Sequence, residues 1–322
     1  MRMKKLVPIL ALTLGLTAFS GCTDTNQKIA FGEYWQLDAL APVEINETLT
    51  YDVKFEANAQ NATDYTLDYT NGSYVTNLSS VMEDGKTIYV YQSVLTITAA
   101  YTFKGVTKTS EDVVTSEVRF QSAKGALAPI SSKKAFKSAS PTTGTHVSVD
   151  ECFQSFIYSV DNDYTTKTSI VKEYDKDGKE LSSETKNFDF EDSDKYSVID
   201  NEQLFVALRA VPDTVTSGTL LAYSPFTNLE QKINFSFASA EGAKFKYFDS
   251  EAEKEVEKQI NYRPVSITLD QNNPGTTQTA WIASKLSNSM NSTRNLLLRL
   301  ETPLAYDLGT MVYTLKSVSH QQ

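Results

Sequence analysis

Cysteine, histidine and long apolar runs are scarce in this chain of 322 residues, and each scarcity excludes a class of protein. The two cysteines, Cys22 and Cys152, and the two histidines, His146 and His320, are too few and too far apart to form a zinc site at ordinary spacing. Neither histidine lies where a scaffold would hold it beside a nucleophile, so both are expected to be solvated surface residues. No glycine-rich phosphate loop or G-x-S-x-G elbow occurs. The sequence therefore predicts no catalytic residue, metal site or cofactor.

Positive charge is also in short supply. The chain has 30 Lys and Arg residues against 40 Asp and Glu residues, and three of the basic residues precede Cys22, which leaves a net charge of −13 from that residue onward. Such a surface repels phosphate backbones and anionic lipid head groups. We therefore expect no nucleic-acid partner, and attachment to a membrane through a lipid and not through a basic patch.

The first 21 residues have the organisation of an export signal, with three basic residues followed by an apolar run that is shorter than the roughly 20 residues of a membrane span. Phe19-Ser20-Gly21-Cys22 resembles the lipobox of bacterial lipoproteins, with Phe19 where that family most often has Leu. The resemblance implies that residues 1–21 are a signal peptide and that Cys22 is modified with lipid, including palmitate. It implies an extracytoplasmic lipoprotein anchored in the cell envelope. An ordinary secretory signal is the alternative.

The remaining chain divides into a tether and a body. Residues 22–45 are expected to form a lipidated tether, whose apolar residues from Phe31 onward either dock on the body or dip into the membrane interface. Residues 46–320 are expected to form a single β-rich domain. Residues 131–146 are rich in Ser, Thr and Lys, which predicts a loop or an internal domain boundary.

The second cysteine, Cys152, has no partner within the chain if Cys22 is lipidated. It is then either buried as a small apolar side chain or available for a bond between chains. The neighbouring Phe153 and Phe156 favour burial.

Alternation of apolar and polar residues predicts most of the secondary structure. Residues 49–55 indicate a half-buried antiparallel strand, and Asn71-Gly72 and Asp84-Gly85 each predict a tight hairpin turn. Residues 87–103 contain no strand breaker, which predicts a long strand that crosses between two packed surfaces or belongs to a strongly twisted sheet. Further strands are expected around residues 65–69, 114–121, 156–160, 169–174, 233–237, 279–283, 296–300 and 311–315, and after Lys254.

One helix is expected over residues 201–211. Asp200 is a good N-cap residue, Gln203 is spaced as its capping-box partner, and Pro212 ends the apolar stripe between them. Together these elements predict a mainly β protein of about ten to thirteen strands, with one or two short helices. The expected architecture is a large curved antiparallel sheet, either a half-open barrel or a sandwich.

The second half resembles an uncharacterised domain family of bacterial envelope proteins related to the half-open β-barrels of lipoprotein carriers. The resemblance depends on apolar spacing in residues 204–210, 217–219, 279–283 and 308–315. It implies a sheet wrapped around a helix, with an apolar concave face that holds a lipid or an acyl chain. An envelope protein is also expected as a possible partner.

Aromatic residues are the candidate ligand-binding groups. Tyr89, Tyr91, Tyr101, Phe103 and Trp281 either line a groove for an apolar ligand or fill the core of the sheet. The function that fits best is a non-catalytic, lipid-anchored binding protein. An interaction or structural module built on a packed sandwich is the alternative, and a hydrolase with an unrecognised site comes third.

Acidic residues between positions 161 and 194 could gather into a weak cation site if their hairpins lie side by side. Separately, the residues at Asp177-Gly178 resemble the start of a calcium loop, but the remaining ligands of such a loop are absent. A hairpin turn explains Asp177-Gly178. No metal site is therefore predicted.

Overall fold

The computed structural model describes residues 28–32, 46–58, 65–141, 148–270, 277–284, 295–304 and 308–320. Its helical segments are α1 (Val149–Cys152), the 3-10 turn η1 (Asn201–Gln203) and α2 (Leu204–Ala210). Its strands are β1 (Asn46–Ala57), β2 (Tyr65–Glu83), β3 (Lys86–Phe103), β4 (Val106–Ala123), β5 (Ala126–Pro141), β6 (Phe153–Asp163), β7 (Thr168–Tyr174), β8 (Glu180–Asn187), β9 (Ser197–Val198), β10 (Ser217–Ser224), β11 (Leu229–Phe237), β12 (Glu241–Asp249), β13 (Lys254–Asp270), β14 (Gln278–Ala283), β15 (Leu297–Pro303) and β16 (Gly309–His320).

All the described strands belong to one sheet of sixteen strands. Its order is β8-β7-β6-β5-β4-β3-β2-β1-β16-β15-β14-β13-β11-β10-β9, and β12 pairs with both β13 and β16. The pairs are antiparallel except β9 with β10 and β12 with β16. Because β12 joins β13 to β16, strands β12 to β16 form a closed ring of five. The predicted mainly β fold is confirmed, with more strands than expected.

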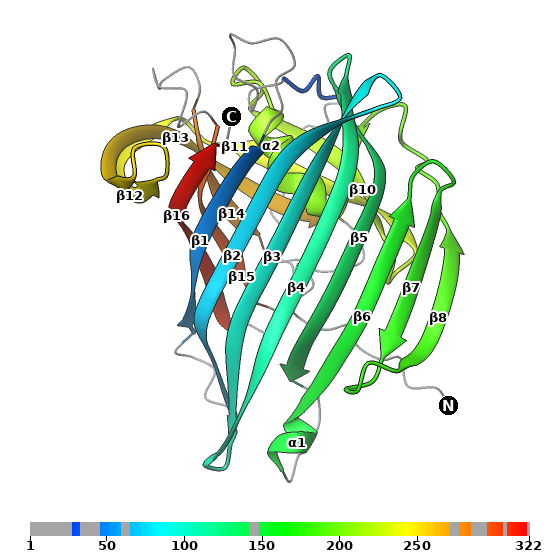
Figure 1. Ribbon diagram of the computed structural model, residues 1–322, viewed down its shortest axis with the longest axis vertical. Helices are drawn as coiled ribbons and strands as arrows, with labels where there is room; N and C mark the ends of the chain where they lie inside the picture. The colour runs from blue at the N-terminus through cyan, green and yellow to red at the C-terminus, as the bar shows by residue number, and fades with distance from the viewer. Residues whose placement is uncertain are drawn as a thin grey trace.

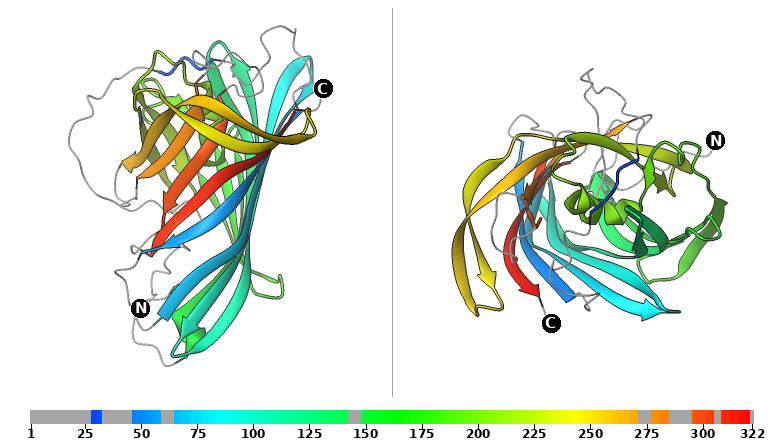
Figure 2. Two further views of the ribbon diagram at one scale, coloured as in Figure 1. Left: turned by 90° about the vertical axis from the view of Figure 1, so that its left-hand side faces the viewer. Right: turned by 90° about the horizontal axis from the view of Figure 1, so that it is seen from above.

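The sheet is curved around a helix. Strands β1 to β8 stand side by side as one wall (Figure 1), and seen from above the wall curves around α2 on its concave side (Figure 2). Every residue of α2 is buried. This arrangement confirms the expected large curved antiparallel sheet. The helix occupies the upper part of the concave face, which is therefore not open to a ligand.

The helix begins where its cap was predicted. The Asp200 side chain accepts a hydrogen bond from the backbone N–H of Glu202, and Gln203 closes a capping box with Asp200. The Gln203 amide also donates to the carbonyl of Leu127 at 3.3 Å, which joins the cap to the start of β5. The predicted start of β13 at Lys254 is likewise confirmed.

The long strands β2 to β5 are joined by three two-residue turns. Asp84-Gly85, Lys104-Gly105 and Lys124-Gly125 all have positive φ at both residues, which suits the right-handed twist of the flanking strands. The first turn was predicted, and so was the uninterrupted strand that follows it. The two Lys-Gly turns were not, because Lys is an uncommon residue at positive φ.

The prediction of a hairpin turn at Asn71-Gly72 is wrong. Strand β2 continues through both residues, and its register with β3 shifts between Thr70 and Ser73. Asn71 has φ 53°, so the pair forms a bulge. A β-carbon on Gly72 would lie 2.5 Å from the Val53 carbonyl oxygen in β1, so only glycine allows this close approach of two strands.

The expected loop over residues 131–146 is wrong as far as Pro141, because β5 runs through this segment and pairs with β4 and β6. Two of the serines that suggested a loop, Ser132 and Ser138, are buried and bind carboxylates. Ser132 Oγ donates to Asp200 Oδ2 at 2.5 Å, and Ser138 Oγ donates to Asp112 Oδ2 at 3.0 Å. These two serine hydroxyls are therefore paired with buried carboxylates. Residues 142–147, including His146, lie outside the described part.

The start of the described chain docks on the body, as predicted. Ile29 and Phe31 are buried. The backbone N–H of Phe31 donates to the Gly125 carbonyl at 2.8 Å, and that of Gly32 donates to the Ala210 carbonyl at 2.7 Å. This segment thus bridges the β4–β5 turn and the end of α2.

Candidate functional site

The concave face is divided into two apolar regions along the length of β3. The first cluster contains the buried apolar residues of α2, packed against strand residues that include Tyr51, Leu78, Tyr89, Tyr91 and Phe120. The second cluster contains no residue of α2, and its buried members are Val53, Leu67, Tyr69, Leu95, Ile97, Ala99, Tyr101, Phe103, Val114, Phe136, Ala139, Val149, Phe156, Leu304 and Met311. The helix therefore fills only one of the two regions.

The four candidate aromatic residues of β3 are split between these regions. Tyr89 and Tyr91 are buried in the first cluster, and Tyr101 and Phe103 are buried in the second. All four share one face of the strand, as the alternation predicted. The structure thus brings the residues together in pairs, and the strand of 18 residues holds the pairs apart.

The fifth candidate, Trp281 on β14, is partly buried against the first cluster. The Arg299 guanidinium lies 5.0 Å from the centre of its ring, a distance at which a cation is attracted to the ring face. Trp281 therefore borders the same cluster as Tyr89 and Tyr91, and not the cluster of Tyr101 and Phe103. Cys22, the predicted lipidation site, lies outside the described residues.

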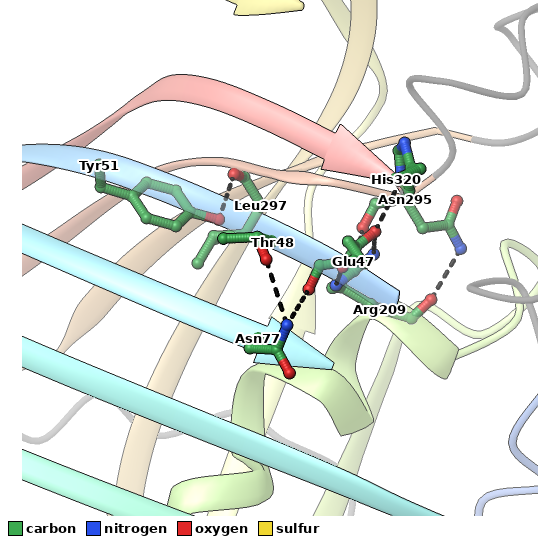
Figure 3. A network of polar contacts seen from close by, with 8 residues as sticks. All are labelled: Glu47, Thr48, Tyr51, Asn77, Arg209, Asn295, Leu297 and His320. Atoms are coloured by element: carbon green, nitrogen blue, oxygen red, sulfur yellow. Dashed lines mark hydrogen bonds and ion pairs between the residues drawn. The ribbon is translucent and has the colours of Figure 1, made fainter. Parts of the chain in front are cut away.

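A buried ion pair holds α2 to the sheet (Figure 3). The Arg209 guanidinium donates to both carboxylate oxygens of Glu47 in β1, at 2.6 and 2.9 Å. Arg209 Nε also donates to the Asn295 carbonyl at 2.9 Å, and the Asn295 amide donates back to the Arg209 carbonyl at 2.7 Å. Both charged side chains are almost fully buried. Two-point pairing of this kind fixes geometry as well as charge.

Neighbouring polar groups extend the network to the strands on both sides. Tyr51 Oη donates to the Leu297 carbonyl at 2.9 Å. The Asn77 amide donates to Thr48 Oγ1 at 3.1 Å and to the Glu47 carbonyl at 3.3 Å (Figure 3). Both charged side chains of this network have partners within the protein, although Asn295 Oδ1 has none among the described residues. The arrangement of the charged pair is that of a structural clamp.

The prediction that His320 is a solvated surface residue is wrong. Strand β16 extends to His320, which pairs with Glu47 in register. His320 Nε2 lies 3.1 Å from Glu47 Oε2, and the side chain is only 26% exposed. Burial by itself would raise the pKa of Glu47, but the Arg209 charge and the hydrogen bonds from His320 and Arg209 outweigh it and lower this pKa to about 2.

A second buried carboxyl lies in the second cluster. Asp112 on β4 is fully buried and pairs with Ile97 of β3. Ser138 donates to Oδ2, whereas Oδ1 has no hydrogen-bond partner of ordinary geometry. Burial raises the pKa of Asp112 to about 7, although Ser138, the Ala139 backbone and Lys137 oppose the shift. The carboxyl is therefore poised between its two protonation states near neutral pH.

The hydroxyl of Tyr101 is the other unsatisfied group in this region. It is buried and has no hydrogen-bond partner among the described residues. Burial raises its pKa, and the nearby Asp112 adds to the shift. Aromatic rings surround the two groups: the ring centres of Tyr101 and Phe153 lie 4.1 Å apart, and Phe136 stacks on Tyr158 at 5.4 Å. Buried polar atoms without partners are rare in proteins, and each calls for an explanation such as an ordered water or a ligand.

The acidic residues between positions 161 and 194 do not converge on one point. Asp163 accepts hydrogen bonds from the N–H groups of Thr165 and Thr166, and Asp192 pairs with Lys195 and Lys232. Within the described ranges no group of three or more potential metal ligands gathers. In the same ranges no helix is long and apolar enough to cross a bilayer.

The residues that sequence reasoning missed had a detectable signal. Glu47 lies two positions before Leu49, and Asp112 lies two positions before Val114. In a strand these spacings put a charged group on the same face as the buried residues. A charge on the inner face of an alternating strand is thus the pattern that would have identified both carboxyls.

Comparison with known proteins yields structural similarity at low sequence identity. No family model and no curated protein matches the chain. Among solved structures, the chain is similar to a beta-barrel-like protein of a domain of unknown function, DUF1849, from Brucella abortus. The sequences are 10% identical, the match covers 86% of this chain and 98% of the other, and the TM-score is 0.43.

Proposed function

We propose that this chain is a lipid-anchored extracytoplasmic binding protein that holds an apolar ligand on the part of the concave face lined by the second cluster. The observation that supports this proposal is the pair of buried, unsatisfied groups, Asp112 Oδ1 and the Tyr101 hydroxyl, within an aromatic wall. The process is binding without a covalent step. Removal of apolar surface from water supplies about 25 cal/mol per Å².

The helix explains why the ligand would bind in the second cluster and not the first. Residues of α2 already cover Tyr89 and Tyr91, which therefore serve as core. The second cluster offers Tyr101 and Phe103 from the same strand, and the helix that reaches it is not α2 but the four-residue α1, through Val149. A mainly apolar molecule with one polar group would contact the rings and give Asp112 and Tyr101 the partners they lack.

Ligand binding is tested on protein that lacks residues 1–22. Mass spectrometry of the purified protein should detect a co-purified lipid, and a fluorescent fatty acid should bind in a 1:1 ratio. Tyr101→Phe removes only the unsatisfied hydroxyl and should weaken binding. The matched control Tyr51→Phe removes a hydroxyl that is bonded to Leu297 in the first cluster and should leave binding unchanged. Absence of both co-purified lipid and fatty-acid binding would refute the proposal.

Lipid attachment needs its own experiment. Labelled palmitate should be incorporated into the full chain and not into the Cys22→Ser variant. Because lipid on Cys22 would carry at least two acyl chains, the full chain should stay with membranes after a high-salt wash, whereas the variant should be released. Label retained by the variant would contradict the assignment of Cys22.

An interaction module remains the second candidate, and one observation favours it. Strand β8 lies at the edge of the described sheet, pairs only with β7 there, and exposes Leu181. An exposed strand edge can accept a strand from another protein. If Leu181→Lys abolishes a crosslinked envelope partner while fatty-acid binding is undetectable in the unmodified protein, the interaction module is the better description.

A further inference from the structure

We propose that the end of the molecule formed by the β2–β3 and β4–β5 turns faces the bilayer, and that Val81 and Met82 contact its interfacial layer. This inference rests on the lipid anchor proposed at Cys22. It assigns an orientation and a contact surface that the anchor alone does not specify, because a lipidated tether is compatible with any orientation if it is long and free.

The docked segment fixes where the tether leaves the body. Phe31 is bonded to the carbonyl of Gly125 in the β4–β5 turn, and Ile29 exchanges hydrogen bonds with Ser197 Oγ through both its N–H and its carbonyl, at 3.1 and 3.2 Å. A β-carbon on Gly125 would lie 3.4 Å from the Ala30 Cα, so the segment packs directly on the turn. The chain therefore enters the body at this end.

The tether is short in comparison with the body. Six peptide bonds join Cys22 to Lys28, and even fully extended they span only about 20 Å. Strand β3 has 18 residues, which at about 3.3 Å per residue extend roughly 60 Å towards the turn at Lys104-Gly105. The anchor can therefore bring only the end with Gly125 close to the membrane unless the molecule lies flat.

The same end exposes apolar side chains. Strand pairing places the Asp84-Gly85 turn level with the Lys124-Gly125 turn, since Tyr89 pairs with Phe120. Met82 is 65% exposed and Val81 is 40% exposed. As neighbours in a strand they point to opposite sides, so both faces of this hairpin tip carry apolar surface. Such a tip can enter the interfacial layer without burying an edge of the sheet in hydrocarbon.

Charge at this end is more favourable than over the whole molecule. The two turns and the strand ends beside them carry the acidic residues Glu83 and Asp84 and the basic residues Lys86, Arg119 and Lys124, and Arg119 pairs with Glu83. The three basic and two acidic residues together have a slightly positive net charge, whereas the chain as a whole has a net charge of −10. These two turns therefore avoid the repulsion by anionic head groups that acidic parts of the surface experience.

The orientation is tested with spin labels on the full, lipidated chain in vesicles of phosphatidylcholine and phosphatidylglycerol. In a Cys152→Ser background, Met82→Cys and Val106→Cys each carry a nitroxide. Val106 is the matched control, because it is 56% exposed, apolar and next to the turn at the opposite end of β3. The label at position 82 should collide severalfold more with oxygen, and severalfold less with a water-soluble nickel complex, than the label at position 106.

Equal accessibility of the two labels, or protection of position 106 alone, would overturn the proposal. Hydrogen exchange gives a second measurement without labels: the backbone of residues 80–88 should exchange more slowly in the vesicle-bound chain than in the Cys22→Ser variant, with no change at residues 102–108. The two hypotheses fail in different ways. A chain that does not float with vesicles lacks the anchor, and the orientation falls with it. A chain that floats with position 82 in water keeps the anchor and loses only the orientation.

Discussion

Glu47 and Arg209 are 162 positions apart in the chain, yet their side chains form two hydrogen bonds in the core, at 2.6 and 2.9 Å. Glu47 is the second residue of β1, and Arg209 lies in the last turn of α2. The pair therefore joins the helix to the sheet where β1 pairs with β16. Because both groups are out of water, loss of one leaves the other charged, buried and unpaired.

The first prediction concerns this pair. Arg209→Met should lower the free energy of unfolding by about 3–5 kcal/mol, the range found when one partner of a buried ion pair is removed. The double variant Glu47→Gln/Arg209→Met should lose less. The control is Lys316→Met, which breaks the exposed pair with Asp52 and should change stability by less than about 1 kcal/mol. Urea denaturation measures all three. Equal effects of the buried and the exposed substitutions would contradict the role of the clamp.

Acid should weaken the same contact. The pKa of Glu47 in the folded chain, about 2, is below its ordinary value of 4.5, so its contribution to stability is complete above about pH 4.5 and is lost as the pH falls towards 2. The urea midpoint of the unmodified protein should therefore drop between pH 5 and pH 3. In Glu47→Gln/Arg209→Met this part of the pH dependence should be smaller, and an unchanged slope would contradict the assignment.

The strand pattern was readable from the sequence because alternation is a local property. Two of the three Asx-Gly pairs show where local information ends. Asp84-Gly85 forms the predicted hairpin turn, whereas Asn71-Gly72 forms a bulge within β2, because Gly72 lies against Val53 of β1. Both dipeptides tolerate positive φ. Whether such a dipeptide forms a turn or a bulge depends on the strand packed beside it.

Long-range partners also explain the errors at β5 and His320. A segment rich in Ser and Lys predicts a loop when it is read alone, but Ser132 and Ser138 bind the buried carboxylates of Asp200 and Asp112. His320 is near the end of the chain, yet its partner is Glu47 in β1. Neither contact is encoded in local spacing. The aromatic candidates show the converse: their shared face was predicted, and the position of α2 that separates them was not.

A further prediction follows from the buried carboxyl of Asp112. Its pKa in the folded chain is about 7, above the ordinary value of 3.8, so the penalty of its charge is absent below about pH 4 and grows until about pH 7. Asp112→Asn removes this penalty. The stability of the variant relative to the unmodified protein should therefore rise between pH 4 and pH 8, by on the order of 4 kcal/mol for a shift of this size.

Denaturation by urea at pH 4, 6 and 8 checks the prediction for Asp112. Asp52→Asn is a suitable control, because Asp52 is half exposed and pairs only with Lys316 at the surface. A difference between Asp112→Asn and the unmodified protein that stays constant across this range would show that the carboxyl is not held in an environment that disfavours its charge.

The last prediction distinguishes two roles of glycine: Gly72 in β2 allows two strands to approach closely, and Gly85 in the following turn allows a positive φ. Gly72→Ala places a β-carbon 2.5 Å from the Val53 carbonyl oxygen and 2.7 Å from the Val53 Cβ, so β1 and β2 must move apart. We expect a loss of about 1–3 kcal/mol, as for other overpacked sites. Gly85→Asn is the control, because no atom lies within 4 Å of a β-carbon there and Asn tolerates positive φ. It should change stability by at most about 0.5 kcal/mol.

Hydrogen exchange should also become faster in β1 for Gly72→Ala alone, and equal behaviour of the two variants would mean that the strands at the bulge can separate without loss of stability.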